Sequence, residues 1–430
     1  MDRRFPSLLA VGLIAGAALL ALAGCRTPVA MGTTLVPAGL PRSVAPVSSA
    51  GLTTAIDNFG LDLLKATSAS AESKGGNVIV SPLSVHAALS MTANGATDET
   101  AKQMRAVLHT DAMDPVEANK QWAALFAGLA ARSPEQTLEI ANSLWARKGI
   151  AFKQPFLDAD RDHFGAQVST LDFAKDDVAA AINAWVSRNT HNMITKMVDQ
   201  VPSDAVMYLA NAVYFKGDWD DPFTHEGTRD QAFTRADGSH VNTAMMHKQQ
   251  GLPYAVNGAL QATQLDYKGL DASFVVMLPR PGVSTDAALA SLEATGFSDL
   301  VHALASPDTT EVVLALPKLD TDFGVSLSKP LAAMGMPRAF DANHADFTGI
   351  ADLGPDARVY IGDVLHKTKV KVDEKGTEAA AATVVEMTGT AAAPVAEPPQ
   401  IICDRPYLFA IVDQKTGVML FLGVVNDPSK

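Results

Sequence analysis

The stretch that decides the fold reads Glu374-Lys375-Gly376-Thr377-Glu378-Ala379-Ala380-Ala381-Ala382-Thr383-Val384-Val385-Glu386. Read with a period of two, one face carries only small or uncharged side chains, namely Thr377, Ala379, Ala381, Thr383, Val385 and Met387. The charges stand on the other face, as in a strand with one buried and one solvated side. Four consecutive alanines are poor strand formers, and the prolines at 394, 398 and 399 argue against a central strand beyond them. The segment is therefore predicted to be a loop that is able to become a strand.

Composition alone leaves two other interpretations of this stretch open. Tracts rich in Ala, Thr and Pro are commonly linkers, although this one lies between two strongly apolar strand signals. Alanine also has the best helix propensity, but residues 383–385 and Gly389 would cut such a helix short. A loop is favoured, and its function stays open at this level.

Two motifs resemble the serpin family of serine protease inhibitors. Residues 374–380 are similar to the serpin hinge, and Asp404-Arg405-Pro406-Tyr407-Leu408-Phe409 resembles the segment after the serpin reactive loop. The resemblance implies that the loop adds to a sheet as a strand. It implies a hinge formed by Glu374, Gly376, Thr377, Glu378, Ala379, Ala380, Ala381 and Ala382. Small or β-branched uncharged residues are needed on the inward face of such a loop, and all six inward positions comply.

The resemblance covers roughly residues 52–428 and implies an α+β serpin fold. In that fold, helices pack around a large central mixed β-sheet, with two further sheets and an exposed reactive-centre loop at about residues 374–400. It also implies two polar sites. The shutter is a buried cluster under the central sheet, formed by Ser81, Ser84, Asn211 and His366. The breach is the place where the loop first enters the sheet, formed by Trp219, Lys318 and Glu374, with Lys318 placed to pair with Glu374.

Each of these residues also has a plainer interpretation. Ser81 before Pro82 is a good pair for the N-cap and first position of a helix in any fold. His366 could be a core histidine bonded to a backbone carbonyl, and Trp219 an ordinary core aromatic residue. The shutter interpretation rests on the requirement that buried polar groups bond to one another.

Several elements are predicted from periodicity. A helix begins near Leu52, with one apolar face formed by Ile56, Phe59, Leu63 and Leu64. Residues 138–146 read as a strand, and Phe152 and Phe156 indicate a helix after it. Residues 182–190 resemble a family helix that ends in a loop. Residues 274–279 read as a short buried strand. The runs 407–412 and 418–425 flank a turn and predict a hairpin.

Composition and charge narrow the classes of partner. The chain is 47% hydrophobic and 19% charged, enough apolar material for one large core or two small ones. The net charge of −13 and the lack of a Lys/Arg cluster argue against nucleic acid and against a heparin-like polyanion. No cofactor or metal is expected, and the chain is expected to be a monomer.

The first 50 residues are predicted to lie outside the fold. Arg3 and Arg4 precede an apolar run of signal-peptide length, and residues 1–24 end in Leu-Ala-Gly before Cys25. This resembles a bacterial lipoprotein box, with Cys25 as the lipidated residue; a plain secretory signal is the competing interpretation. Residues 25–50 would form a flexible Pro-rich tether, and the serpin domain would span 51–430. The expected location is the bacterial cell envelope, as an outer-membrane lipoprotein facing the periplasm or the cell surface, or release outside the cell. The remaining Cys403 has no disulfide partner.

The resemblance implies a suicide-substrate inhibitor. A serine protease would cleave the loop, become acylated, and be trapped when the loop enters the central sheet. Counting from the hinge gives Thr390-Ala391 as the reactive bond, whereas counting back from Pro406 gives Val395-Ala396. Small or aliphatic residues at both bonds point to elastase-like or subtilisin-like endopeptidases.

Two rival functions stay open. A non-inhibitory member of the same fold would be a binding or chaperone module that is only a protease substrate, but such a protein would typically carry bulky or charged inward hinge residues. A hydrolase is disfavoured because no Gly-x-Ser-x-Gly, His-Glu-x-x-His, paired cysteine or phosphate-loop motif appears. The sequence therefore predicts a protease inhibitor and not an enzyme.

Overall fold

The computed structural model describes residues 33–37, 39, 41, 48–70, 72–130, 133–174, 177–201, 206–269, 271–292, 295–351, 353, 358–377 and 397–430. The predictions for residues 1–24 and Cys25 lie outside this part of the chain. So do those for the hinge residues Glu378 to Ala382 and for both candidate reactive bonds, Thr390-Ala391 and Val395-Ala396.

The described part of the chain contains both helices and strands. The helices are α1 (Ala50–Ser68), α2 (Pro82–Ala93), α3 (Asp98–Val107), α4 (Pro115–Ala130), α5 (Gln154–Ala159), the π-helix η1 (Asp160–Phe164), α6 (Val178–Asn189), α7 (Thr285–Ser291), α8 (Thr295–Leu304), α9 (Ser328–Met334) and the 3-10 helix η2 (Pro337–Phe340). The strands are β1 (Thr33–Val36), β2 (Val78–Val80), β3 (Gln136–Arg147), β4 (Gln167–Leu171), β5 (Met207–Asp218), β6 (Thr228–Thr234), β7 (His240–Leu252), β8 (Tyr254–Val256), β9 (Leu260–Asp266), β10 (Ala272–Pro279), β11 (Thr310–Pro317), β12 (Leu319–Ser326), β13 (Asp363–Asp373), β14 (Gly376–Thr377), β15 (Gln400–Ile402), β16 (Tyr407–Asp413) and β17 (Met419–Val425).

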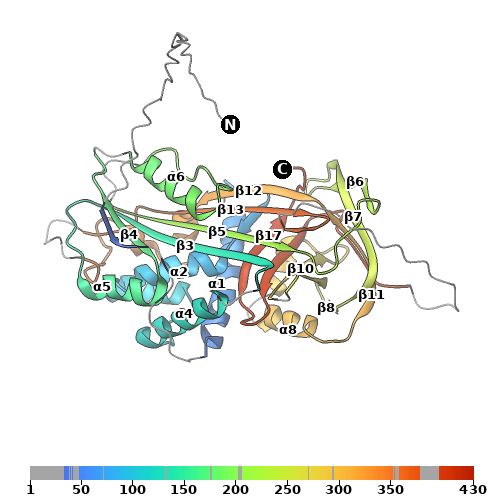
Figure 1. Ribbon diagram of the computed structural model, residues 1–430, viewed down its shortest axis with the longest axis horizontal. Coiled ribbons are helices and arrows are strands. Elements are labelled where there is room, and N and C mark those ends of the chain that lie inside the picture. The colour runs from blue at the N-terminus through green and yellow to red at the C-terminus, as the bar shows by residue number, and fades with distance from the viewer. Residues whose placement is uncertain are drawn as a thin grey trace, which may run out of the picture.

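The strands form three sheets. The central sheet has the order β1-β4-β3-β5-β14-β13-β12, the second sheet β2-β17-β16-β10-β9-β8, and the third sheet β15-β11-β7-β6. Figure 1 shows α6 on one side of the central sheet and α1, α2 and α4 on the other, with β6, β7 and β11 at one end of the long axis. Both parallel and antiparallel pairs occur in the central sheet, so it is mixed as predicted.

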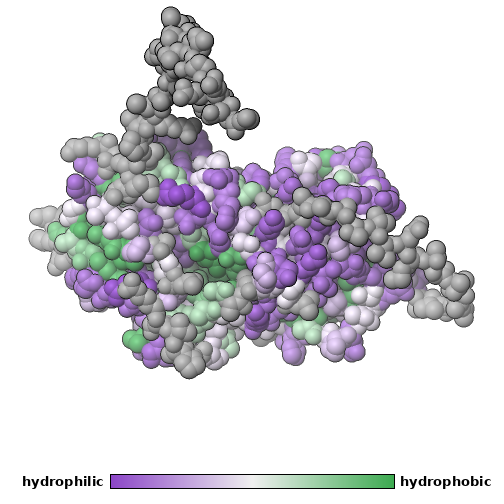
Figure 2. Space-filling view, viewed as in Figure 1, coloured by the Kyte–Doolittle hydropathy of each residue, from purple (hydrophilic) through white to green (hydrophobic). Residues whose placement is uncertain are grey.

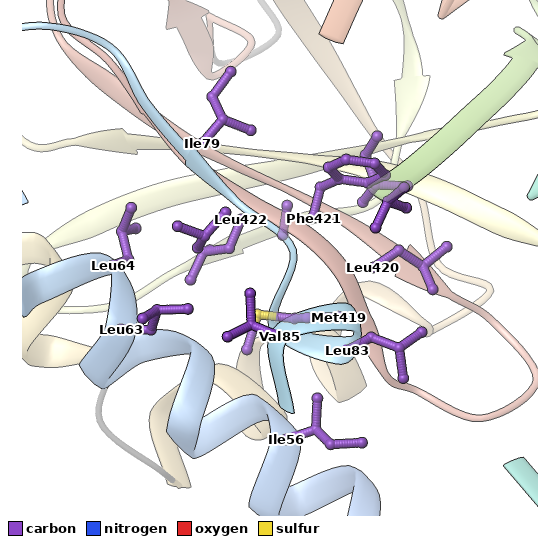
Figure 3. Packing of buried hydrophobic residues seen from close by; sticks show 14 of the residues in the cluster. Ile56, Leu63, Leu64, Ile79, Leu83, Val85, Met419, Leu420, Phe421 and Leu422 are labelled. Carbon is purple, nitrogen blue, oxygen red and sulfur yellow. The ribbon is translucent and has the colours of Figure 1, made fainter. Parts of the chain in front are cut away.

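The main core lies between the helices and the second sheet. The predicted apolar face of α1, with Ile56, Phe59, Leu63 and Leu64, is completely buried. Figure 3 shows three of these side chains gathered with Leu83 and Val85 of α2 and with residues 419–422 of β17. Both faces of β17 are buried, so its sequence is continuously apolar and does not alternate. The predicted hairpin is confirmed, because β16 pairs antiparallel with β17.

A smaller core lies between α6 and the outer face of the central sheet. Trp185 of α6 packs edge-on against Trp145 of β3, with ring centroids 6.3 Å apart. Ala141, Ala210 and Ala212 lie in the same cluster and give the helix room to approach the strands. Figure 2 shows hydrophobic side chains gathered toward the end that carries β4 and α5, whereas the opposite end around β6 is mostly hydrophilic.

The tether prediction is wrong at four residues. Thr33–Val36 form strand β1, which pairs antiparallel with β4 at the edge of the central sheet. Val36 is 3% exposed, and the Gly39 N–H donates to the Gly165 carbonyl oxygen at 2.9 Å. The Pro-rich composition around this segment hid the strand, because an edge strand needs few apolar residues. Among the described residues, no helix is both long enough and apolar enough to span a bilayer.

Candidate functional site

The candidate site is the joint between β5 and β13 in the central sheet. These parallel strands pair from Tyr208 with Asp363 to Ala212 with Lys367. Among the described residues, no ladder pairing joins 213–216 of β5 to 368–371 of β13. A hollow at this point is lined by side chains of both strands, including Val213, Phe215 and Lys371, and by Thr377. The central sheet is therefore closed at one end of this joint and open in its middle.

Strand β14 occupies the far end of the joint. Gly376 and Thr377 pair with Asp218 and Gly217 of β5 on one side, and with Asp373 and Val372 of β13 on the other. A Cβ atom at position 376 would collide with the Gly217 carbonyl oxygen and come within 2.7 Å of Asp218 Cα, so only glycine fits there. The sequence placed Thr377 in the hinge of a loop that enters the sheet after cleavage; in the structure Thr377 already lies in the sheet.

The structure brings Lys318 and Glu374 together, as the sequence predicted. Lys318 Nζ lies 2.8 Å from Glu374 Oε2. The hydroxyl of Thr228 donates to Glu374 Oε1 at 2.9 Å, and His225 Nδ1 lies 3.4 Å from the same oxygen. The sequence analysis missed Thr228 and His225, because they lie more than a hundred residues away in the chain. Glu374 is 4% exposed, so these three partners replace its hydration.

The environment of Glu374 favours its ionised form. Burial raises the pKa of this carboxyl, but the hydrogen bonds from Lys318 and Thr228, together with the charge of Lys318, outweigh burial and lower the pKa to about 2. The glutamate is therefore a carboxylate at neutral pH. Thr228 begins β6 and Lys318 follows β11, so both partners of Glu374 come from the third sheet or its end. Their bonds to Glu374 therefore hold the residues just before β14 against that sheet.

Trp219 holds the backbone that leads into β14. Its indole Nε1–H donates to the Asp373 carbonyl oxygen at 2.9 Å, and its backbone N–H donates to the Lys375 carbonyl oxygen at 2.6 Å. The indole also stacks on Tyr267, with centroids 4.6 Å apart and an interplanar angle of 12°. The hydroxyl of Tyr267 in turn lies 2.6 Å from Thr377 Oγ1. Trp219 is thus placed where the loop enters the sheet, and Tyr267 is an additional contact that the sequence did not reveal.

The shutter residues meet under the closed end of the joint. His366 Nε2 accepts the backbone N–H of Ser81 at 3.1 Å, so Nδ1 carries the ring proton and donates to Asn211 Oδ1 at 3.1 Å. The amide nitrogen of Asn211 donates to Ser84 Oγ and to Asn142 Oδ1, the latter at 2.6 Å. His366 is 1% exposed, and its burial lowers its pKa from 6.5 to about 3. The imidazole is therefore neutral at physiological pH.

Two details of the shutter differ from the prediction. Ser81 stands at the N-cap position of α2, but its hydroxyl makes no capping bond. Within the described residues this buried hydroxyl has no hydrogen-bond partner, and Ser81 joins the network through its backbone instead. Asn142 of β3 is a further member, buried and opposite Asn211 in the ladder. A lone asparagine within a strand gave no signal in the sequence.

The described residues of the site form backbone pairings, one ion pair and a buried hydrogen-bond network. The described residues contain no group of three or more His, Cys, Asp or Glu side chains arranged to hold a metal ion. Cys403 is buried, and burial raises the pKa of its thiol. What the geometry offers is a partly open sheet joint, a polar network that closes one end and a two-residue strand that begins to fill the other.

Comparison with known proteins assigns the family. Residues 54–428 match the family model for Serpin (serine protease inhibitor), so the chain belongs to the serpin family, whose members are generally protease inhibitors. The leukocyte elastase inhibitor of Sus scrofa is 30% identical over 387 residues, covering 88% of this chain and 99% of its own. A serpin-like protein of Thermococcus kodakarensis is 32% identical over 380 residues, covering 87% of this chain and 85% of its own.

The fold has solved counterparts. The crystal structure of the thermophilic serpin tengpin in its native state is similar with a TM-score of 0.82 and 30% identity, covering 92% of this chain and 99% of that one. The predicted serpin fold, with a large mixed sheet and two further sheets, is therefore confirmed.

Proposed function

We propose that this serpin is a suicide-substrate inhibitor of elastase-like or subtilisin-like serine endopeptidases. A protease would cleave the reactive loop and be held as an acyl-enzyme while the loop enters the central sheet as a strand. The observation that carries the proposal is strand β14, because Gly376 and Thr377 already pair on both sides within a joint that is open beyond them.

The register of β14 fixes where each loop residue would lie after insertion. Thr377 is opposite Gly217 and Val372, so Ala381 would be opposite Val213 and Thr368 at the end of the open stretch. From position 382 onward, the entering strand would replace the pairing of β5 with β13. Thr383 would lie between Asn211 and His366 and separate them. The neutral imidazole supports this step, because a hydrogen bond between neutral groups exchanges at a small net free energy.

The same register supports the predicted inward face. Neighbouring residues that are directly opposite in a sheet point to the same side. Thr377 bonds to the buried Tyr267, so residues 379, 381, 383, 385 and 387 would point inward with it. None of these residues is charged. At about 3.3 Å per residue, residues 377–390 would span roughly 45 Å, the length of a long central strand.

The choice between the two reactive bonds follows from this length. Cleavage at Thr390-Ala391 leaves a strand that fills the joint with a short remainder, which presses the protease against the body of the serpin. Cleavage at Val395-Ala396 would lengthen the segment between the inserted strand and the protease by five residues. The protease would then be pressed less against the serpin, which favours release of active protease. We propose Thr390-Ala391 as the inhibitory bond. The aliphatic residues around both bonds fit the shallow pocket of an elastase, and the leukocyte elastase inhibitor among the relatives is consistent with this class.

The test is to mix the full chain with pancreatic elastase and with subtilisin. We expect an SDS-stable complex at the summed mass and a released C-terminal fragment that begins at Ala391. A matched pair of variants separates insertion from cleavage: Ala381→Glu places a charge on the inward face, whereas Ala380→Glu places it outward, near Lys369. Only Ala381→Glu should convert the inhibitor into a substrate.

The opposite results would identify the rival function. A clipped loop with fully active protease, from wild type and both variants alike, would mean that the protein is a non-inhibitory binding or chaperone module. A fragment beginning at Ala396 within a stable complex would keep the inhibitor but move its reactive bond.

We also propose that Cys25 carries a lipid anchor in a bacterial cell envelope. Only residues 26–32 separate Cys25 from β1, so a lipid there would hold the β4 edge of the central sheet within about 28 Å of the bilayer. Intact mass and detergent partition of the cell-derived protein test this. A Cys25→Ala chain should lose the added mass and leave the detergent phase; equal partition of both chains would refute the anchor.

A further inference from the structure

A cavity of about 210 Å³ lies between α2, α3 and α4, apart from the sheet joint. These helices pack on the side of the central sheet that is opposite α6 (Figure 1). No residue of the breach or the shutter lines this cavity. Its lining residues are Ser90, Ala93, Asn94, Ala96, Ala101, Arg105, Leu108, Thr110, Met113, Pro115, Ala118, Asn119 and Trp122.

The cavity exists because small residues stand where larger ones would fill the space. Four of its wall residues are alanines, contributed by α2, the turn after α2, α3 and α4. Its apolar lining includes Leu108, Met113 and Trp122, and Trp122 is only 1% exposed. The ring of Trp122 is held by stacking on Phe126 at 5.2 Å and by contact with His86 at 5.5 Å. Trp122 is therefore a fixed and almost fully covered part of the wall, and the apolar surface left for a ligand is that of Met113 and the partly exposed alanines.

The polar lining is positively charged. Arg105 is half-buried, and no hydrogen bond or ion pair joins its guanidinium to any residue in the described part of the chain. Glu99, on the same helix, is instead engaged by Lys102 and Gln103. A partly desolvated guanidinium without a counter-ion attracts an anion, and its planar fork matches a carboxylate.

Two amides complete the polar lining. Asn94 and Asn119 exchange hydrogen bonds of 3.2 and 2.9 Å, which leaves each side chain one N–H and one oxygen lone pair to spare. The cavity thus combines an apolar surface, one cation and additional donors. This combination suits a small amphipathic anion.

We propose that this cavity binds a small aromatic carboxylate, with the carboxylate on Arg105 and the ring in the apolar part of the cavity, beside Met113 and Ala118. A cavity of about 150 Å³ accommodates benzene, so the larger volume here admits one ring with a short acid side chain. For a ligand of this size we expect a dissociation constant of about 0.1–1 mM. Binding is independent of loop cleavage, because the cavity is separate from the sheet joint.

The probe is 3-phenylpropionate, and its uncharged amide serves as the matched ligand. Calorimetry or ligand-detected NMR on the intact chain should give saturable one-to-one binding of the acid and about tenfold weaker binding of the amide. Arg105→Met should lower the affinity for the acid to that for the amide and leave the affinity for the amide unchanged. Arg188→Met, which removes an exposed arginine from α6, should leave both ligands unchanged.

A filled cavity provides the second test. Ala118→Leu on α4 should abolish binding of both ligands, and circular dichroism shows whether this variant is folded. If it is not, Ala96→Leu blocks the cavity from the opposite wall. The proposal is overturned if wild type shows no saturable binding up to about 10 mM. It is equally overturned if the acid and the amide bind alike, or if a folded, filled variant still binds the acid.

Discussion

The joint between β5 and β13 and the joint between β16 and β17 are built in opposite ways. The β16–β17 ladder runs from Tyr407 with Val425 to Val412 with Met419; both strands are buried, and within the ladder no side chain is charged. The β5–β13 ladder stops at Ala212 with Lys367, and the pair next to this end, His366 with Asn211, is polar and buried. One joint is sealed by apolar packing, and the other is closed by hydrogen bonds.

The difference shows what the proposed strand insertion requires of one chain, namely a second sheet that stays paired and a central sheet that opens. Separating β16 from β17 would expose apolar surface at about 25 cal/mol per Å², with nothing to replace the lost packing. At the β5–β13 joint an entering strand brings its own backbone donors and acceptors, so the hydrogen bonds that are lost are remade. Under the proposed mechanism, the hydrogen bonds of the shutter would therefore be exchanged at a small net free energy, while the second sheet would stay paired.

Cleavage within residues 378–396 should produce the largest effect. We expect the nicked chain to melt about 10 °C or more above the intact chain, because the freed segment would add a complete central strand. Differential scanning calorimetry of the two forms measures this shift. The nicked Ala381→Glu variant is the control and should gain far less. Equal melting temperatures for intact and nicked wild type would remove strand insertion from the mechanism.

Removing the polar centre of the β5–β13 joint should have the next largest effect. His366→Leu leaves the Ser81 N–H and Asn211 Oδ1 without partners and should cost about 3 kcal/mol of unfolding free energy in urea. The matched change in the second sheet is Thr263→Val, which loses a single 2.8 Å bond to the Pro253 carbonyl oxygen and should cost about 1 kcal/mol. Equal losses would mean that the shutter is an ordinary buried polar contact.

Acid should weaken the same joint through His366. Its folded pKa of about 3 lies below its unfolded value of 6.5, so the unfolded chain binds the extra proton between these values. The stabilisation is complete above pH 6.5 and falls as the pH is lowered, by about 2 kcal/mol between pH 7 and pH 5. Urea unfolding at both pH values measures it. The buried His86 adds a similar loss in both proteins, so His366→Leu should show a shallower dependence and not a flat one. Identical slopes would contradict the assignment.

The ion pair of the breach should give the smallest effect. Glu374→Gln removes the carboxylate held by Lys318 and should cost about 1 kcal/mol at pH 7, since Lys318 is 40% exposed and the pair is partly screened. The folded pKa of Glu374 is lowered to about 2, so its stabilisation is present above pH 4.5 and is lost as the pH falls from 4.5 toward 2. The difference between wild type and variant should shrink over that range. Asp271→Asn, which breaks the 2.6 Å pair with Lys415 beside the second sheet, provides the comparison. A difference that is constant with pH would show that the charge of Glu374 is not what stabilises the breach.

Local patterns predicted much of this molecule. The buried face of α1 follows from helical periodicity, and the β16–β17 hairpin from two apolar runs around a turn. The pairing of Lys318 with Glu374, and the presence of Ser84, Asn211 and His366 in one cluster, came from family motifs, and these residues are in contact in the structure. The edge strand β1 was missed, because its four residues carry no period that distinguishes them from a tether.

The sequence by itself determined which face of the loop segment is free of charge, since a period of two is a property of neighbouring residues. Only the tertiary structure decided that Gly376 and Thr377 already lie in the sheet, that Asn142 and Tyr267 contact the site, and which ring nitrogen of His366 carries the proton. These facts depend on strand register and on partners that are distant in the chain. The side chain of Asn211 bonds a residue 127 positions away, and that of His366 one 285 positions away. Such contacts are set by how the sheets and helices pack, and a local pattern does not record that packing.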